Sequence, residues 1–211
     1  MRRPHFIAAQ SRCPSGWLGW LIGSLMVHET AAANDAVLDA LALGDADRVL
    51  DVGCGPGRTV ERAARATPRG HVAGLDPSDE MLRVAAKRCR SLIDAGRVEL
   101  RRGDAAALPY AAQSVDKVLS VHTLYFWADA AAVVRELQRV LAPGGRLVLG
   151  FRPKEDASFV ASFPASVYRF HAKNDVTGLL FDAGFEQVVA GDGGGITIVT
   201  AVRSGRYSNP T

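Results

Sequence analysis

The sequence predicts an α/β fold built on a doubly wound sheet of seven strands, mostly parallel, with an antiparallel strand at its C-terminal end. From residue 31 onward, strand-like and helical patterns alternate, which is typical of a parallel sheet covered by helices on both faces. The first strand runs directly into a glycine-rich turn, the position where such sheets bind ligands. Only the glycine-rich segment 191–195 separates the last two strands, so these two must pair antiparallel.

Short apolar runs bounded by turn-forming residues define the strands. The runs lie between helical patterns, except at the C-terminal end, where two of them follow one another directly. The predicted strands cover residues 48–52, 71–75, 98–101, 115–121, 146–151, 185–190 and 196–202.

Apolar residues at helical spacing predict five helices around these strands, and most of them end at a clear stop signal. Gly44 ends the first helix, Pro68 follows the second and Gly184 ends the last. Ser78 is the expected N-cap of the third helix, and a Pro-Gly-Gly turn at 143–145 closes the fourth. The predicted helices lie around residues 36–41, at 59–66, after Ser78 as far as residue 86, at 130–141 and at 175–183.

Composition limits the class of protein. The 211 residues are enough for one domain with a substantial core, and 48% of them are hydrophobic. The net charge of +3 is too small to favour nucleic acid or an acidic membrane as a partner. The three cysteines form no C-x-x-C pair, so neither a disulfide framework nor a metal site is expected. A reducing, cytoplasmic setting fits best.

The chain is expected to divide into three parts: an N-terminal cap or lid, residues 1–30; a single domain, residues 31–203; and a flexible tail, residues 204–211. Apolar residues at positions 17, 18, 21, 22 and 25 would form one face of a helix in the cap. A secretory signal peptide is the alternative, because two arginines precede an apolar run. That run lies far from the arginines and is too short to cross a bilayer.

The loop GCGPG, residues 53–57, carries the strongest functional signal. Glycines there turn the chain tightly and remove the β-carbons that would keep a ligand off the backbone. The dinucleotide pattern G-x-G-x-x-G is not met, because Arg58 stands where its third glycine belongs. Asp51 would repel a pyrophosphate and attract a cationic ligand. The loop therefore predicts a nucleoside ligand that carries positive charge and no phosphate.

Four segments resemble, in order, the motifs of the class I S-adenosylmethionine-dependent methyltransferases. They are VLDVGCGPG (49–57), GLDPSDEML (74–82), GDAAALPY (103–110) and VLAPGGRLVL (140–149). The resemblance is close over residues 48–150 and looser over the last two strands. It implies a Rossmann-like fold, methyl transfer as the reaction and S-adenosylmethionine as the cofactor.

The resemblance also implies roles for single residues. Asp76 would accept hydrogen bonds from both ribose hydroxyls, at a strand end expected to face solvent. Asp104 would accept from the adenine amino group, and the Ala105 amide would donate to the adenine ring. The cofactor-binding residues implied in this way are Asp51, Gly53, Cys54, Gly55, Gly57, Asp76, Pro77, Met81, Gly103, Asp104, Ala105, Ser120 and Val121.

Several of these residues also have a purely structural explanation. Asp76 and Asp104 could cap helices or form turns, because aspartate is favoured at such positions. Asp51 could instead hold the loop by accepting hydrogen bonds from its amides. Cys54 is interpreted as a packing residue, since no base is evident near it.

The methyl acceptor is expected at the end of the fourth strand, where the chain reads SVHTLYFWAD (120–129). The cofactor brings the reactive group, and the protein mainly aligns the acceptor with it. His122 could remove a proton from a hydroxyl or a carbon acid, and Tyr125 is the second predicted catalytic residue. Phe126 is expected to anchor the next helix to the core. The predicted substrate contacts are Trp17, Tyr125, Trp127, Tyr168 and His171.

Missing motifs narrow the substrate to a small organic acceptor, phenolic or quinone-like in view of the aromatic residues. The chain lacks the Asn/Asp-Pro-Pro-Tyr/Phe turn of base-amino and glutamine methylation and the Pro-Cys of cytosine carbon methylation. Basic residues between positions 83 and 102 are interpreted as a solvated sheet edge, with a phosphate-binding stripe as the alternative. Two other functions are left open: an NAD-type oxidoreductase on the same sheet, and a non-catalytic protein that binds S-adenosylmethionine.

Overall fold

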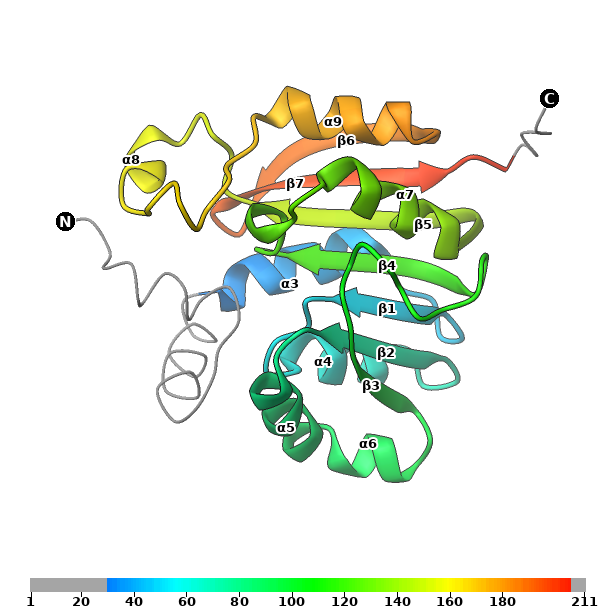
Figure 1. Ribbon diagram of the computed structural model, residues 1–211. Helices are drawn as coiled ribbons and strands as arrows, with labels where there is room; N and C mark the ends of the chain where they lie inside the picture. The colour runs from blue at the N-terminus through cyan, green and yellow to red at the C-terminus, as the bar shows by residue number, and fades with distance from the viewer. Residues whose placement is uncertain (1–29, 206–211) are drawn as a thin grey trace.

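The computed structural model describes residues 30–205, which form one seven-stranded sheet with helices on both faces (Figure 1). The strand order is β3-β2-β1-β4-β5-β7-β6. All neighbouring pairs from β3 to β5 are parallel, and β7 runs antiparallel to both β5 and β6. The predicted fold class is therefore confirmed. The strands are β1 Arg48–Val52, β2 His71–Asp76, β3 Val98–Arg102, β4 Val115–Val121, β5 Leu141–Phe151, β6 Phe185–Gly193 and β7 Ile196–Arg203.

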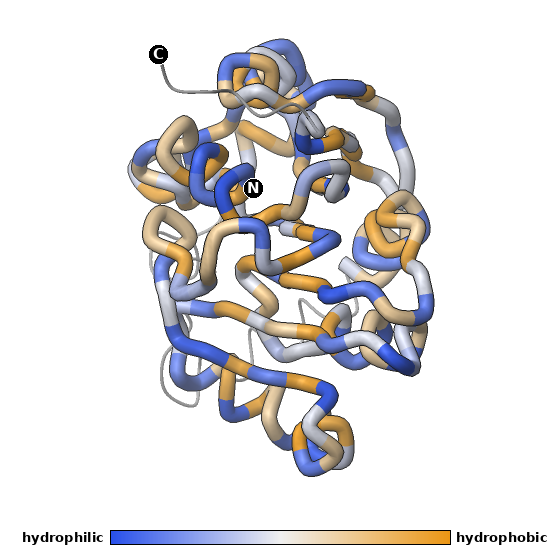
Figure 2. The backbone as a smooth tube through the Cα atoms, turned by 90° about the vertical axis from the view of Figure 1, so that its right-hand side faces the viewer, coloured by the Kyte–Doolittle hydropathy of each residue, from blue (hydrophilic) through white to orange (hydrophobic). Residues whose placement is uncertain are grey.

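The helices separate into two layers because two hydrophobic cores fill the two faces of the sheet. One core joins α7 and α9 to the sheet, and the other joins α3, α4 and α5 to its opposite face. In both cores most residues of the inner strands are buried, and Figure 2 shows apolar stretches interrupted by polar residues along the backbone. The helices are α3 Ala31–Leu41, α4 Arg58–Ala66, α5 Asp79–Arg88, α6 Arg90–Asp94, η1 Leu124–Phe126, α7 Ala130–Val140, α8 Ala157–Val160 and α9 Lys173–Asp182.

Two of the predicted helix signals act as expected. The Ser78 hydroxyl accepts a hydrogen bond from the Met81 amide at 3.3 Å and caps α5. Gly184 follows α9 with φ of 85°, the left-handed conformation that glycine adopts most readily. The short elements α6, η1 and α8 were not predicted, because three to five residues are too few to show a helical period.

One strand begins earlier than the sequence predicts. We expected the fifth strand to start at Arg146, after a closed turn, but β5 extends back to Leu141. Leu141 pairs with Val115, and Arg146 pairs with Lys117, so the Pro-Gly-Gly segment forms a bulge between two paired positions. The strand starts earlier than predicted because the bulge lets the hydrogen-bonded pairing with β4 continue on both sides of the Pro-Gly-Gly segment.

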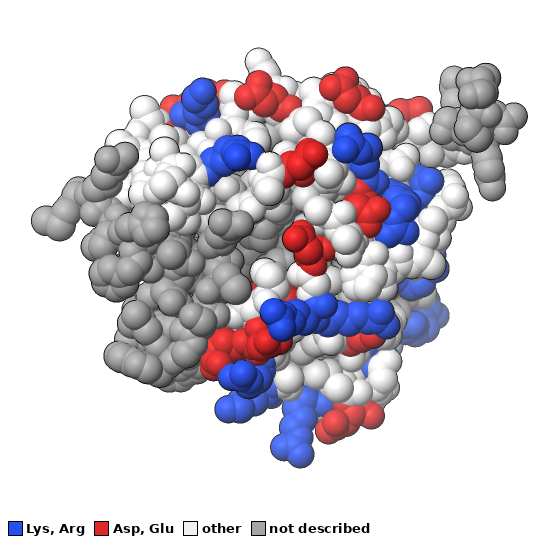
Figure 3. All heavy atoms as spheres, in the orientation of Figure 1, with Lys and Arg blue, Asp and Glu red and all other residues white. Residues whose placement is uncertain are grey.

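Most of the basic residues between positions 83 and 102 form ion pairs with acidic neighbours, and the face seen in Figure 3 carries both basic and acidic side chains. Arg97 turns inward and donates to the backbone carbonyls of Gly70 and Ala64. This arrangement fits the solvated sheet edge and gives no support to a phosphate-binding stripe.

Three further expectations concern the ends of the chain, the membrane and metal sites. Nearly all of the predicted cap, with Trp17, and most of the predicted tail lie outside the described residues. Within residues 30–205, no helix has the length and apolar character needed to cross a membrane. The same residues contain no group of three or more metal-ligating side chains.

Candidate functional site

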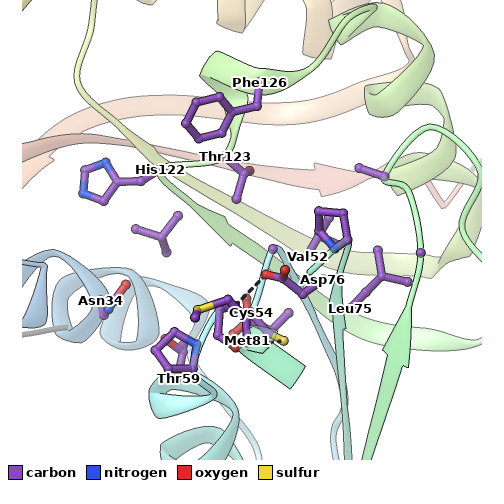
Figure 4. Close-up of a pocket in the computed structure, with 18 of the residues that line it drawn as sticks. Asn34, Val52, Cys54, Thr59, Leu75, Asp76, Met81, His122, Thr123 and Phe126 are labelled. Atoms are coloured by element: carbon purple, nitrogen blue, oxygen red, sulfur yellow. Dashed lines mark hydrogen bonds between the residues drawn. The ribbon is translucent and has the colours of Figure 1, made fainter. Parts of the chain in front are cut away.

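A cavity of about 420 Å³ opens at the carboxyl ends of β1, β2 and β4, where a doubly wound sheet binds its ligand. The loops that follow these strands supply most of its wall. Figure 4 shows Asp76, Cys54 and Met81 on one side of the cavity and His122, Thr123 and Phe126 on the other. The cavity therefore joins the predicted cofactor loop to the predicted acceptor segment.

The glycine loop after β1 owes its shape to conformation and close packing. The Gly53 and Cys54 amides both donate to the Leu75 carbonyl, at 2.7 and 3.0 Å, which fastens the loop to the end of β2. Gly53 has φ of 78°, and a β-carbon there would lie 2.2 Å from the Thr123 side chain. Gly55 has φ of 51°, and its β position meets no atom within 4 Å. The clash with Thr123 requires glycine at position 53, whereas at Gly55 the left-handed φ favours glycine and open space remains in front of the chain.

Asp76 is buried rather than solvent-facing, so our expectation about its environment was wrong. It is 6% exposed, and its two carboxylate oxygens accept hydrogen bonds from the Gly55 amide at 2.9 Å and the Ser78 amide at 2.8 Å. Burial raises the pKa of this carboxyl, and the two amides oppose that shift. Asp76 therefore ties the glycine loop to the start of α5 and also lines the cavity.

Asp51 has a carboxylate oxygen without a partner. Its Oδ2 is buried and accepts no hydrogen bond from any described residue, and the side chain lines the cavity. Burial, followed by repulsion from Asp76, raises the pKa of Asp51 to about 8. The loop-holding alternative needs loop amides that donate to this carboxylate, and Oδ2 receives none. A cationic ligand in the cavity would supply the missing partner.

The predicted adenine-binding turn also borders the cavity. Gly103, Asp104 and Ala105 all line it. Asp104 is exposed, and its Oδ1 accepts a hydrogen bond from the Ala106 amide at 2.9 Å, the geometry of an Asx turn. Asp104 therefore both forms the turn and lies at the cavity wall.

The remaining predicted cofactor residues fall into two groups. Cys54 lines the cavity with its thiol buried, and burial raises the pKa of that thiol well above its usual range, which fits a packing residue. Gly57 and Ser120 do not line the cavity. A β-carbon at Gly57 would lie 2.8 Å from that of Ala85, and the Ser120 hydroxyl donates to the Val52 carbonyl at 2.6 Å. Pro77, Met81 and Val121 line the cavity as expected.

His122 is the first residue after β4, and it lines the cavity in a left-handed conformation with φ of 58°. Its amide donates to the Gly150 carbonyl at 2.8 Å, which holds this unusual conformation. Burial, followed by the positive charge of Arg152, lowers the pKa of the imidazole to about 4. His122 is therefore uncharged at neutral pH.

The aromatic residues of the segment point differently from the prediction. Tyr125 and Tyr168 are 3% and 5% exposed, do not line the cavity, and pack against each other with ring centroids 5.6 Å apart. Phe126, expected to serve only as an anchor, lines the cavity together with Trp127, and it also packs on Tyr168. His171 lies away from the cavity wall and is half-buried, and its Nε2 has no partner among the described residues.

Several cavity residues were missed by sequence reasoning. Asn34 stands on an alanine-rich helix, α3, and its polar side chain among small apolar neighbours was the one available signal. Arg58 and Thr59 begin α4 directly behind the glycine loop, so their place at the wall follows from the fold. Thr30, Val52, Pro56, Leu75, Thr123 and Phe126 also line the cavity.

Comparison with known proteins identifies the family. A family model described as a methyltransferase domain matches residues 50–149. An uncharacterized methyltransferase of Bacillus subtilis strain 168 is 31% identical over 139 residues, which cover 65% of this chain and 75% of the relative. The chain belongs to the class I S-adenosylmethionine-dependent methyltransferases.

Other relatives of this methyltransferase agree. A ubiquinone/menaquinone biosynthesis C-methyltransferase of Syntrophotalea carbinolica is 31% identical over 196 residues, which cover 80% of this chain and 82% of the relative. A crystal structure of an S-adenosylmethionine-dependent methyltransferase from Aquifex aeolicus has a TM-score of 0.70 at 22% identity, over 83% of this chain and 92% of the other. That likeness supports the fold.

The cofactor of this methyltransferase is S-adenosylmethionine, and the cavity fits it. The unpartnered oxygen of Asp51 offers a negative partner to a positively charged ligand. The open space in front of Gly55 lets such a ligand approach the backbone. An NAD-type oxidoreductase on the same sheet has no comparable support.

Proposed function

We propose that this methyltransferase acts on a small organic acceptor with a phenolic or quinone-like ring. The observation that carries the proposal is the continuity of the cavity, which runs from Asp51 and Asp76 to His122, Phe126 and Trp127. A flat aromatic acceptor packed on Phe126 and Trp127 would lie in the same cavity as the bound cofactor.

The charge at the acceptor end supports this choice over a cationic amine. Beside His122 in the chain, the described residues that line the cavity are Val121, Thr123, Phe126 and Trp127, none of which carries a carboxylate. The acidic residues of the described wall are Asp51, Asp76 and Asp104, which we assign to the cofactor, and Arg58 is the basic one. A protonated amine would lose its hydration at the acceptor end without gaining an anionic partner there.

The residues would divide the work as follows. Bound S-adenosylmethionine supplies an electrophilic methyl group. We assign the nucleoside to Asp76, Asp104 and the Ala105 amide, and the positive charge to Asp51. His122 and Phe126 orient the acceptor. Trp127, 7% exposed, closes one wall and helps to exclude water. The segment 1–30 is proposed as a further cover of the same opening, because Thr30 and Asn34 bring its end to the cavity wall.

One relative adds independent support. The Syntrophotalea carbinolica protein named above is a C-methyltransferase of ubiquinone/menaquinone biosynthesis, and the alignment covers most of both chains. This similarity supports a quinone-like ring as the acceptor of the present methyltransferase.

The test is an acceptor screen with methyl-labelled S-adenosylmethionine. The screen compares hydroquinones, simple phenols, primary amines and carboxylic acids, and it measures label in the product together with S-adenosylhomocysteine release. We expect label in the hydroquinones or phenols. Phe126→Ala should raise the KM for the aromatic acceptor by about tenfold, because a buried phenyl contact of roughly 1.5 kcal/mol is lost, and should leave the Kd of the cofactor unchanged.

The matched control is Phe181→Ala, because Phe181 is 58% exposed on α9 and does not line the cavity. It should leave both constants unchanged. Label found only in amines would refute the acceptor class. Tight cofactor binding with no labelled product from any class would favour the non-catalytic binding protein.

A further inference from the structure

His122 and Tyr125 form a hydrogen-bonded pair that the binding of the cofactor does not explain. The Nδ1 atom of His122 lies 3.1 Å from the Tyr125 hydroxyl. The Arg152 amide donates to the same hydroxyl oxygen at 2.6 Å. The chain of contacts thus runs from the backbone at the end of β5, through a buried phenol, to an imidazole at the cavity wall.

The protons of these two hydrogen bonds can be placed by counting donors and acceptors. A backbone amide always carries its proton, so the Tyr125 oxygen accepts from Arg152. The phenol has one proton of its own, and His122 Nδ1 is its one acceptor among the contacts of the described residues. If Nδ1 carried a proton instead, the phenol would accept twice and its own proton would be buried without a partner, since Tyr125 is 3% exposed.

We propose that Tyr125 is a positioning residue that holds neutral His122 with its proton on Nε2, so that His122 donates a hydrogen bond to an oxygen of the methyl acceptor. The inference rests on the proposed function for the identity of the acceptor, and on the geometry of the pair for the proton position. It replaces the expectation that His122 is a general base, because an Nε2 that carries a proton cannot take another from the acceptor.

The surroundings of His122 support a fixed donor. Its low pKa keeps the ring neutral at pH 7, so the position of the single proton decides what the ring can do. Its amide contact to Gly150 and its bond to Tyr125 hold both the backbone and the ring. A donor held in this way favours an acceptor whose oxygen carries negative charge, such as a phenolate or an enolate oxygen beside the methylated atom.

The first experiment reads the tautomer without any ligand. Two-dimensional ¹H–¹⁵N spectra of the imidazole rings distinguish a protonated from an unprotonated ring nitrogen. The chain has five histidines, so His122→Gln assigns the signal of His122 by removing it. We expect an unprotonated Nδ1 and a protonated Nε2 in the wild-type protein. Tyr125→Phe should shift the signals toward a mixture of the two tautomers.

Tyr110→Phe is the matched control for that loss of a hydroxyl. Tyr110 is half-buried and its hydroxyl has no hydrogen-bond partner among the described residues. The His122 signals should therefore stay where they are in this variant. A wild-type spectrum with the proton on Nδ1 would overturn the proposal and would leave the methyltransferase assignment untouched.

The second experiment compares two substitutions of His122 by turnover. Glutamine can donate a hydrogen bond but cannot act as a base, and Gln113 and Gln187 already adopt φ of 58° and 52° in this chain. We expect His122→Ala to lower kcat by about a hundredfold and His122→Gln to recover about tenfold of that loss. Equal inactivity of the two variants would refute the donor role, whereas a wild-type protein inactive on every acceptor would refute the proposed function.

Discussion

The pH dependence of cofactor binding is the most direct test of Asp51. In the free protein, burial and the neighbouring Asp76 raise the pKa of Asp51 to about 8, so the carboxyl is mostly protonated at pH 7. A cation in the cavity favours the ionised form, and binding must then release a proton. If the bound carboxylate stays ionised, the affinity for S-adenosylmethionine should rise by about 50-fold from pH 6 to pH 8 and level off above that.

The same shift predicts how the free protein responds to pH. The carboxyl holds its proton more tightly in the folded than in the unfolded protein, where its pKa is near 3.8. The stabilising effect is therefore complete below about pH 4 and is lost as the pH rises through 8. As the pH rises from 6 to 8, ionisation of Asp51 in the folded protein should lower the free energy of unfolding by about 2.3 kcal/mol.

Calorimetry and urea unfolding measure these two effects. Titration with S-adenosylmethionine in two buffers of different ionisation enthalpy gives the number of protons released, which should approach one at pH 7 and vanish above pH 9. Asp51→Asn should bind the cofactor weakly, with little change between pH 6 and pH 8, and its unfolding should lose most of the pH dependence. A wild-type Kd that is constant over this range would refute the assignment of the positive charge to Asp51.

Three other predictions concern Asp76, Gly57 and the N-terminal segment. Asp76→Ala should weaken S-adenosylhomocysteine binding by at least about tenfold and lower the urea midpoint, whereas Asp79→Ala at the exposed start of α5 should do neither; an unchanged Kd would leave Asp76 only its loop contacts. Gly57→Ala should lower the unfolding free energy by about 1–3 kcal/mol, because its β-carbon would meet Ala85, and Gly191→Ala, with open space around it, should not. Deleting residues 1–28 should leave a folded protein, by circular dichroism, that binds cofactor more weakly and loses turnover; full turnover would exclude a lid.

The sequence predicted the fold well because the signals that define it are local and repeated. The strands lie beside turns or helices and most of them contain an apolar stretch, and the Ser78 cap and the Gly184 stop need no tertiary information. The start of β5 was misplaced because a bulge depends on the register against β4, which no single segment contains.

The environment of Asp76 shows a second limit. Its place at the end of β2 followed from the motif, but its burial follows from the return of the glycine loop over the strand end, where the Gly55 amide meets the carboxylate. A motif specifies which residues come together, and it does not specify how much water the closed loop leaves beside them. The same holds for Asp51, whose unpartnered oxygen becomes visible only when every neighbouring amide has been placed.

The roles of Tyr125 and Phe126 could not be separated from the sequence, because neighbouring residues in a single turn differ only in direction. The turn η1 has about three residues per revolution, so successive side chains point about 120° apart. With no second turn, there is no periodic pattern to show which of them faces the core. The structure directs Phe126 to the cavity and Tyr125 inward to the Arg152 amide, within reach of His122. The sequence predicted that the Tyr125 hydroxyl contacts the substrate, whereas in our proposal Tyr125 acts on the substrate only through the imidazole of His122. The effect of Tyr125 on catalysis therefore has to be measured at the ring nitrogens of His122.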